Sequence, residues 1–354
     1  MPTPRELLTT FLEGGVPERT PYSIYGWFFE DPRYPVEAWK PLLERGLGVS
    51  ASCATVRHIK HGVTSHTETW TAGGRRYVRD WKETPVGSLQ QVTAYIGGPD
   101  GGILGWTQEE WIKTPHDYRI RQWIVEHTEL VPQYGQFAQV DEQVGAQGVV
   151  IVDGSRTPAM SIQVDWAGVE RFCLDVAEGV DELLALYEAQ KNQFLEETRL
   201  IAAGPGFFVR WLENLTIGTL GPRRYEKLLL PIYQEAVPIL EASGKRVMVH
   251  YDGALKVIRD QVARAPFHII ESLTEPPEGD MTYAECRAAW PDKAFWANLN
   301  LDLYALPPEA LAEAVIARCE RAGKRALAFE ISEDVPPNWR DAVPVVLETL
   351  EKLR

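Results

Sequence analysis

The sequence has few cysteines, and none of them lie close together. The four cysteines (Cys53, Cys173, Cys286 and Cys319) are widely separated, and no Cys-x-x-Cys pair occurs. This spacing argues against a disulfide framework and against a thiolate zinc site, and it favours a reducing compartment. We therefore expect a cytoplasmic protein.

Long apolar runs, an excess of positive charge and phosphate-binding motifs are also missing. No stretch reaches the length of a membrane span, and the first residues do not have the pattern of a signal peptide. The formal net charge of −14 opposes binding to nucleic acid or to an anionic membrane, and it disfavours a large polyanionic substrate. Neither Gly-x-Gly-x-x-Gly nor Gly-x-x-x-x-Gly-Lys-Ser/Thr follows any expected strand, so dinucleotide and nucleotide-phosphate sites lack support.

What the sequence does contain is an alternation of short apolar runs and helical patterns. Strands are expected near residues 22, 50, 150, 208, 247, 268, 295 and 327, with helices between most of them. This alternation predicts βαβ units, and eight such units fit a (β/α)₈ barrel of the α/β class better than an open sheet. We predict one TIM-barrel domain over residues 1–354. A small antiparallel β-hairpin insertion is expected at about 62–96, where alternating residue types flank Gly73-Gly74.

The segment 245–253 gives the strongest indication of chemistry. Its apolar residues 247–249 predict a strand that is buried on both faces, and a polar cluster begins at His250, where the strand should end. Residues i and i+2 of an extended segment point the same way, so His250 and Asp252 are expected side by side. Together they offer a nitrogen and an oxygen ligand suited to Zn²⁺. The alternative is that residues 252–253 form a turn and that His250 is a hydrogen-bonded core residue.

Polar residues follow most of the expected strands, and the carboxyl ends of barrel strands carry the active site. A ring of acids around one histidine is unfavourable to bury unless protons or a cation compensate. We predict that His250, Asp252 and a late-strand acid, Glu333, bind a divalent metal that keeps an open position, and that they act in catalysis. The alternative is that acids such as Glu333 cap the helices that follow. The strand-end residues are Trp27, Asp153, Arg156, Arg210, Glu213, Asn214, His250, Asp252, Glu271, Asn298, Asn300, Glu330, Glu333 and Asp334.

Aromatic residues lie on or beside these strand ends. Most aromatic rings fill protein cores, but rings in these positions are also candidates for the wall of an apolar pocket that takes a flat substrate. The predicted substrate-binding residues are Trp27, Tyr251, Arg210, Trp211, Glu213 and Asn214.

Three stretches resemble the uroporphyrinogen decarboxylase superfamily. They are Arg5–Pro21, then Leu220–Tyr233 with the Gly244-Lys-Arg and His-containing strand after it, and Ser332-Glu-Asp-Val-Pro-Pro337. The resemblance spans nearly the whole chain and implies a (β/α)₈ barrel. True uroporphyrinogen decarboxylases carry Arg-x-Ala-Gly-Arg just after the first strand, where it grips substrate carboxylates. This sequence has Tyr25-Gly-Trp-Phe-Phe-Glu-Asp31 there, which argues against a substrate with many carboxylates.

The sequence is more similar to the zinc-dependent methyltransferase branch, whose members exchange a methyl group with a corrinoid protein or cobalamin. In that branch a His-x-Cys pair and a later Cys hold zinc, and the matching positions here are His250, Asp252 and Glu333. The resemblance implies Zn²⁺ in a harder N/O site, where it is a stronger Lewis acid suited to an ether oxygen.

The implied reaction is demethylation of a small methyl donor, such as an aromatic methyl ether, with the methyl group passed to cob(I)alamin on a separate corrinoid protein. Neither nucleic acid nor a membrane is expected as a partner. The alternatives are a metal-independent decarboxylase of the porphyrinogen type and a non-enzymatic binding protein on a barrel scaffold.

Overall fold

The protein is described by a computed structural model that covers residues 2–95, 105–215, 217–323 and 325–353. The chain divides into two compact units. The first unit comprises residues 1–56, 132–155 and 198–354, and the second comprises residues 57–131 and 156–197. None of the described helices is long and apolar enough to cross a membrane. A single domain over residues 1–354 stays a prediction.

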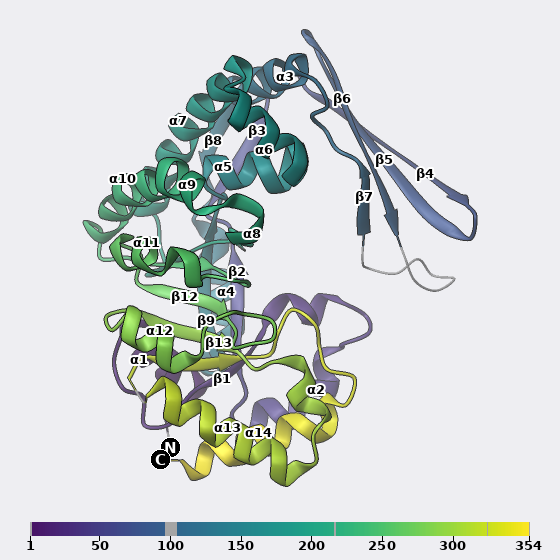
Figure 1. The fold of residues 1–354 in the computed structure, drawn as a ribbon. Helices are drawn as coiled ribbons and strands as arrows, with labels where there is room; N and C mark the ends of the chain where they lie inside the picture. Colours follow the sequence, from purple (N-terminus) through teal and green to yellow (C-terminus); the bar gives the residue numbers. More distant parts are fainter. Residues whose placement is uncertain (1, 96–104, 216, 324, 354) are drawn as a thin grey trace. The chain divides into compact units, whose positions relative to one another are not determined.

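The first unit is a closed barrel of eight parallel strands, so the predicted TIM barrel is confirmed (Figure 1). Every strand that the apolar runs predicted belongs to this barrel, and the order of the strands around it is β1-β14-β13-β12-β11-β10-β9-β2. The strands are β1 (Tyr22–Tyr25), β2 (Gly48–Cys53), β9 (Gly148–Gly154), β10 (Phe208–Trp211), β11 (Arg246–His250), β12 (Ile269–Leu273), β13 (Ala294–Asn298) and β14 (Leu327–Glu330).

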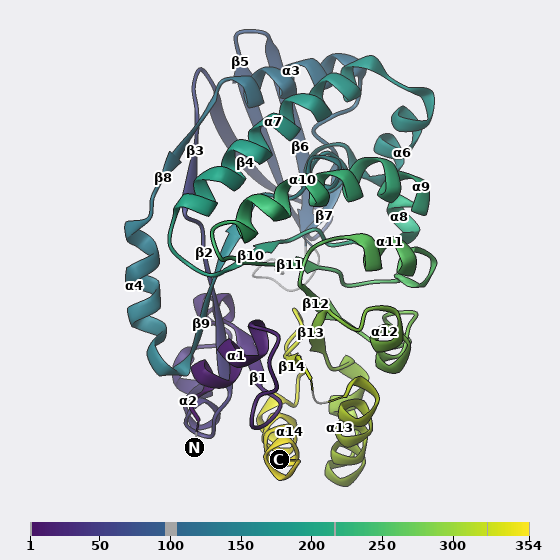
Figure 2. The same cartoon turned by 90° about the vertical axis from the view of Figure 1, so that its left-hand side faces the viewer.

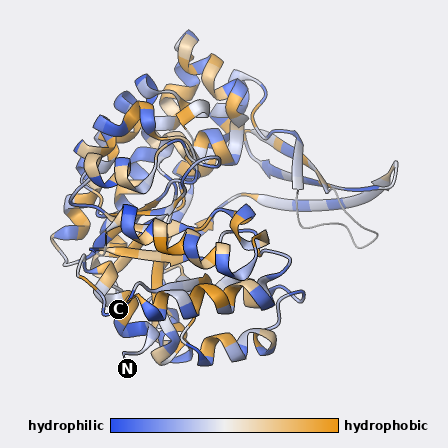
Figure 3. Ribbon diagram, turned by 60° about the horizontal axis from the view of Figure 1, so that its bottom comes forward, coloured by the Kyte–Doolittle hydropathy of each residue, from blue (hydrophilic) through white to orange (hydrophobic). Residues whose placement is uncertain are grey.

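Helices connect and cover these strands, and the strands are the most hydrophobic part of this unit in Figure 3. The longer helices are α1 (Pro4–Leu12), α2 (Val36–Glu44), α4 (Gly135–Val144), α10 (Leu230–Glu241), α13 (Pro308–Ala322) and α14 (Trp339–Lys352). Shorter helical segments are η1 (Gly26–Glu30), η2 (Gly145–Gln147), α8 (Ile217–Leu220), α9 (Pro222–Arg224), η4 (Tyr225–Leu229), η5 (Lys256–Ile258), α11 (Arg259–Arg264), α12 (Tyr283–Ala289) and η6 (Leu301–Ala305).

Helix α1 contributes its apolar face to the barrel core. Thr3 and Glu6 form a reciprocal capping box at its amino-terminal end, which satisfies two backbone donors that the first turn would otherwise leave unpaired. Leu8, Phe11 and Leu12 are buried in one cluster with apolar side chains from six of the strands. The Phe11 ring meets the Trp296 ring of β13 edge to face, with 5.6 Å between their centroids.

The barrel strands place a polar layer directly beyond this apolar cluster. The cluster includes Ile151, Phe208, Met248, Ile269, Trp296 and Ala328. Side chains two residues apart on a strand point to the same side. The next side chains on the same side are therefore Asp153, Arg210, His250, Glu271, Asn298 and Glu330. The polar residues at the carboxyl ends of the strands therefore point into the barrel interior, because each lies two positions after a residue of the apolar cluster.

The second unit contains antiparallel strands and helices. Strands β4 (Thr64–Ala72) and β5 (Arg75–Thr84) form the hairpin that the sequence predicted, and β6 (Gly87–Tyr95) and β7 (Gly105–Glu109) extend it to a four-stranded sheet. Strands β3 (Val56–Lys60) and β8 (Thr128–Pro132) pair with each other, as Figure 2 shows. The helices are α3 (Pro115–Glu126), α5 (Pro158–Met160), η3 (Ser161–Ala167), α6 (Gly168–Glu178) and α7 (Asp181–Ala203), the last of which continues into the first unit.

Candidate metal centre

His250 ends strand β11 and is completely buried. Its Nδ1 lies 2.7 Å from Oε2 of Glu271, which occupies the paired position on the neighbouring strand β12. A carboxylate acceptor at Nδ1 holds a proton on that nitrogen, so Nε2 is the nitrogen that would face a metal ion. Nε2 is buried and makes no hydrogen bond with any residue that the structure describes. A buried polar atom without a hydrogen bond is rare in folded proteins and calls for a ligand.

Two carboxylates converge on this nitrogen. Oε1 of Glu333 lies 3.2 Å from Nε2 of His250, and Oδ2 of Asp252 lies 3.7 Å from it. One ligand atom from each of these residues falls within 4.8 Å of the other two. The structure therefore brings His250, Asp252 and Glu333 together, as the sequence predicted. One imidazole nitrogen and two carboxylate oxygens suit Zn²⁺ or another divalent first-row metal, and three protein ligands leave a position open.

Glu271 is held as a charged carboxylate by two cationic neighbours. Burial raises its pKa, but His250 and Arg210 outweigh this effect and lower the pKa to about 2. Nη1 of Arg210 donates to Oε1 of Glu271 at 3.1 Å, while its Nε donates to Asp153 at 2.9 Å. Nη2 of Arg210 donates to Oγ of Ser52 at 2.6 Å. A chain of charge-assisted contacts therefore runs from Asp153 through Arg210 and Glu271 to His250, and it fixes the imidazole ring.

The same charges shift the titration of the three candidate ligands. Burial lowers the pKa of His250, but Glu271 and the neighbouring Asp252 and Glu333 raise it to about 10. Burial raises the pKa of Asp252, yet His250 and a hydrogen bond from Asn214 keep it below its usual value. Burial raises the pKa of Glu333, and the attraction of His250 offsets only part of this rise. Without a metal, a proton on His250 offsets part of the negative charge of Glu271, Asp252 and Glu333. A divalent cation would replace that proton.

A second buried acid, Glu330, lies at the end of β14. Its Oε1 accepts hydrogen bonds from Oγ of Ser50 at 2.5 Å and from Oγ of Ser23 at 3.1 Å. Its Oε2 is buried and has no partner among the described residues. Burial and the charge of Glu271 raise the pKa of Glu330 to about 8, so this carboxyl group carries a proton at neutral pH. Within the polar layer, Glu271 is thus a charged acid and Glu330 is a neutral one.

Three of the six predicted substrate-binding residues lie around this layer. Trp27, on η1, is 39% exposed and stacks on Tyr25, with ring centroids 5.4 Å apart. Arg210 is buried within the polar layer, where its ion pairs occupy it. Asn214 hydrogen-bonds Asp252. These positions are compatible with contact to a substrate, and the substrate-binding role of all three stays a prediction.

Tyr251, Trp211 and Glu213 lie instead in a buried aromatic cluster. The Tyr251 hydroxyl donates to that of Tyr233 at 3.0 Å, and the Tyr233 hydroxyl donates to Oε1 of Glu213 at 3.0 Å. Trp211 stacks on Tyr233, with centroids 5.9 Å apart. Tyr251 and Trp211 follow His250 and Arg210 directly, so their side chains alternate to the opposite side of the barrel wall. The structure therefore gives these three residues packing partners and does not place them with His250.

Three further strand-end residues, Asn298, Asn300 and Arg156, have structural partners. Nδ2 of Asn298 donates to Oγ of Ser272 at 2.6 Å, and Nδ2 of Asn300 donates to the backbone oxygen of Glu275 at 2.9 Å. Arg156 belongs to the second unit and pairs there with Asp165 at 2.7 Å. None of these contacts involves His250.

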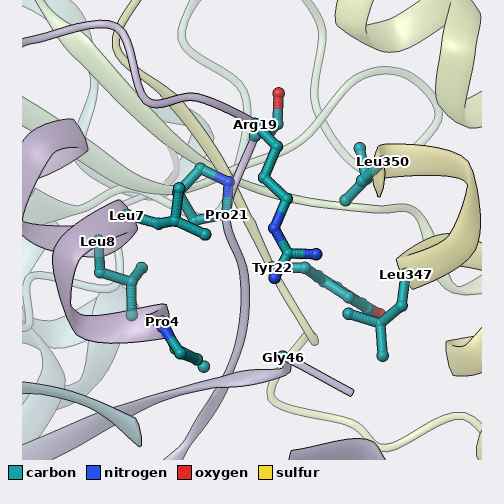
Figure 4. Close-up of a pocket in the computed structure, with 11 residues that line it drawn as sticks. Pro4, Leu7, Leu8, Arg19, Pro21, Tyr22, Gly46, Leu347 and Leu350 are labelled. Carbon is teal, nitrogen blue, oxygen red and sulfur yellow. The ribbon is translucent and has the colours of Figure 1, made fainter. Parts of the chain in front are cut away.

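A small pocket lies at the other end of the barrel, beside the first residues of β1 and β2 (Figure 4). It is lined mainly by apolar side chains of α1 and α14, among them Leu7, Leu8, Leu347 and Leu350, with Arg19 at its edge. Its volume of about 10 Å³ leaves room for no more than a water molecule. This pocket holds no cluster of candidate ligands and is not a rival site.

Sequence reasoning missed the residues of the polar layer that come from the first two strands. Ser23 and Ser50 hydrogen-bond Glu330, and Ser52 hydrogen-bonds Arg210. The Tyr25 ring centre lies 5.9 Å from the guanidinium carbon of Arg210. Alternation along β1 and β2 could have indicated these residues, because positions 23 and 25 lie on one face of β1 and positions 50 and 52 lie on one face of β2.

Comparisons with known proteins bear on the fold alone. No family model matches the sequence, and no curated protein matches it. Among solved structures, the chain is similar to a B12-independent methionine synthase from Shewanella sp. W3-18-1 in complex with selenomethionine. The TM-score is 0.45 at 9% identity, over 91% of this chain and 85% of that chain. It is also similar to a GH5-4 broad specificity endoglucanase from an uncultured bacterium, with a TM-score of 0.44 at 8% identity, over 99% of this chain and 97% of that chain. Likeness at this level assigns no function. Membership of the uroporphyrinogen decarboxylase superfamily stays a prediction.

Proposed function

We propose that this protein is a metal-dependent enzyme whose divalent cation, Zn²⁺ in our hypothesis, is held by His250, Asp252 and Glu333. The observation that carries the proposal is the buried Nε2 of His250, which faces two carboxylate oxygens and has no hydrogen bond with any described residue. The carboxylate of Glu271 on Nδ1 is the outer contact that metal-bound histidines commonly have. When bound, a divalent cation would supply a Lewis acid at the end of the barrel strands.

The reaction that we propose is removal of a methyl group from a small ether or similar donor, with a corrinoid protein as the methyl acceptor. This choice rests on the sequence resemblance to zinc-dependent methyltransferases, and the N/O ligand set favours an oxygen substrate. In such a reaction the carbon–oxygen bond breaks, the methyl carbon bonds to the cobalt of the reduced corrinoid, and the oxygen takes up a proton.

The chain's own residues would have distinct tasks in this reaction. Arg210 and Glu271 fix His250 so that Nδ1 keeps its proton and Nε2 stays available. Glu330 carries a proton at neutral pH on a carboxyl group whose Oε2 has no partner among the described residues. It is therefore our candidate for the group that supplies a proton to the departing oxygen. Trp27 is our candidate for contact with an aromatic donor.

A metal-independent decarboxylase of the porphyrinogen type is the competing proposal. Such an enzyme needs arginines that are free to bind several substrate carboxylates. The end of β1 and η1 supplies none, and Arg210 is already paired with Asp153 and Glu271. These contacts favour the methyltransferase.

The test is methyl transfer to free cob(I)alamin in the presence of Zn²⁺ and a panel of methoxylated aromatic compounds. Wild-type protein should convert cob(I)alamin to methylcobalamin with at least one compound. The change in absorbance of the corrinoid would measure the rate. His250→Ala should lower the rate at least a hundredfold. His268→Ala is the matched control, because His268 pairs with Glu241 at 3.0 Å and not with any of the three candidate ligands. It should leave the rate within about threefold of wild type. A rate that His250→Ala does not change, or coproporphyrinogen formation by metal-free protein, would overturn the proposal.

A further inference from the structure

Strand β4 of the second unit is an edge strand without the usual protection. Within the described residues it pairs only with β5, through nine consecutive residue pairs and without a bulge (Figure 1). Sheet edges are commonly protected by charged side chains, above all lysine, and by proline, bulges or short strands. The sequence of β4, Thr-Ser-His-Thr-Glu-Thr-Trp-Thr-Ala, has no lysine or proline and a single acidic residue, Glu68, and all of its residues except His66 are exposed.

The turn between β4 and β5 determines which backbone groups of β4 point outward. Gly73 and Gly74 form a two-residue connection in which both have positive φ, +56° and +73°, as a type I′ turn requires. In such a hairpin the flanking residues, Ala72 and Arg75, are a hydrogen-bonded pair, and hydrogen-bonded and non-hydrogen-bonded pairs then alternate along the strands. The backbone groups of Ser65, Thr67, Thr69 and Thr71 therefore point away from β5 and toward the free edge.

We propose that this edge pairs with β4 of a second copy of the chain, antiparallel, with the twofold axis at Thr67. In this register Thr67 faces Thr67 of the second copy, and Ser65 faces its Thr69 in both directions. Hydroxyl-bearing side chains thus meet on one face of the joined sheet, a favourable kind of cross-strand pair.

Cross-strand side-chain pairing favours this register over its neighbours. With the axis at Thr67, His66 lies opposite Glu68 of the second copy, and Glu68 lies opposite its His66. An axis at Thr69 would place Glu68 opposite Trp70 and His66 opposite Ala72. An axis at Glu68 would set two like charges against each other, and it would also use backbone groups that already bind β5.

The contacts that Glu68 and His66 make within one chain leave this pairing possible. Glu68 forms an ion pair with Arg79 of β5, and His66 lies 3.4 Å from Glu83. In the joined sheet Glu68 would lie between Arg79 of its own chain and His66 of the second copy, whose imidazole N–H group can donate a hydrogen bond to it. The contact is isologous, because the same strand serves both copies, and it closes after two chains.

Cysteine cross-linking tests the strand pairing and its register. The background would be Cys173→Ser/Cys319→Ser, because these two cysteines are partly exposed whereas Cys53 and Cys286 are buried. Facing residues of a hydrogen-bonded pair have Cα atoms about 5.5 Å apart, within the range of a disulfide. Thr67→Cys should therefore give a covalent dimer under mild oxidation, seen on a non-reducing gel at micromolar protein.

Thr71→Cys is the matched control on the same strand and edge. Its sulfur and that of its copy would be separated by eight residues of strand, about 27 Å, and should not cross-link. Equal cross-linking at both positions, or cross-linking at Thr71→Cys alone, would overturn the proposed register.

The association itself is tested by sedimentation of the full chain. Wild-type protein should show a concentration-dependent dimer, and Thr67→Pro should weaken it at least tenfold. Proline removes an outward N–H group while leaving the β5 ladder intact. Thr67→Val keeps that N–H group and should dimerise within about threefold of wild type. Circular dichroism would confirm that the variants fold. A wild-type protein that stays monomeric up to about 100 µM, or a Thr67→Pro variant that dimerises as well as wild type, would contradict the proposal.

Discussion

Replacing Glu271 by glutamine should weaken metal binding without removing a metal ligand. Glu271 accepts from Nδ1 of His250 at 2.7 Å and from Arg210 at 3.1 Å, and both partners are buried with it. Glutamine keeps the size and one acceptor oxygen but loses the charge. Outer-sphere substitutions of this kind lower metal affinity about 10–100-fold, which corresponds to about 1.4–2.7 kcal/mol. We expect Glu271→Gln to raise the Kd for Zn²⁺ within that range.

Glu330→Gln is the matched control. Glu330 is equally buried, but its hydrogen bonds go to Ser50 and Ser23 and not to His250. Its substitution should leave the Kd for Zn²⁺ within about threefold of the wild-type value, because it removes no contact with the ligand set. The Kd would be measured by competition with a chelating dye at pH 7.5, after thermal melts show that both variants fold. An unchanged Kd in Glu271→Gln, or equal weakening in both variants, would refute this account of His250.

Two further predictions concern the barrel itself. A Cβ atom at Gly148 would lie 1.9 Å from the backbone oxygen of Val49, so Gly148→Ala should lower the free energy of unfolding by about 2 kcal/mol or more. A Cβ atom at Gly135 would meet nothing within 4 Å, so Gly135→Ala should change the free energy of unfolding by no more than about 0.5 kcal/mol. Urea unfolding would measure both changes. Burial lowers the pKa of Lys293 to about 8 although its Nζ donates to the backbone oxygen of Phe267. The folded protein therefore binds fewer protons than the unfolded chain between about pH 8 and 10.5, so its free energy of unfolding should rise with pH across this window. This rise should be about 3 kcal/mol larger in wild type than in Lys293→Met, which lacks the titrating group. Equal pH slopes in the two proteins would contradict the assigned shift.

The sequence was sufficient to predict the barrel because each buried strand is a short, mostly apolar run and helical patterns separate most of these runs. The sequence also predicted that the side chains of His250 and Asp252 lie close together, because residues i and i+2 of an extended segment point to the same side. The contact with Glu333 depended on a long-range expectation, that the ends of β11 and β14 open on the same end of the barrel. The 3.2 Å separation bears this expectation out.

The orientation of two strand-end aromatics was missed although the sequence contains the signal. Tyr251 and Trp211 directly follow His250 and Arg210, so alternation turns them toward Tyr233 and away from the polar layer. The contrast between Glu271 and Glu330, by comparison, could not be predicted from the sequence. Both are buried acids on barrel strands, and only the placement of Arg210 and His250 beside Glu271 makes one a charged carboxylate and the other a neutral acid.

The most direct test of the central claim is calorimetric titration of Zn²⁺ into metal-free protein, for wild type and for His250→Ala. We predict that wild-type protein binds one equivalent, with release of the proton that otherwise sits on His250. The variant should lose this binding. Wild-type protein that binds no zinc, or a variant that binds one equivalent with the same affinity, would contradict the metal centre formed by His250, Asp252 and Glu333.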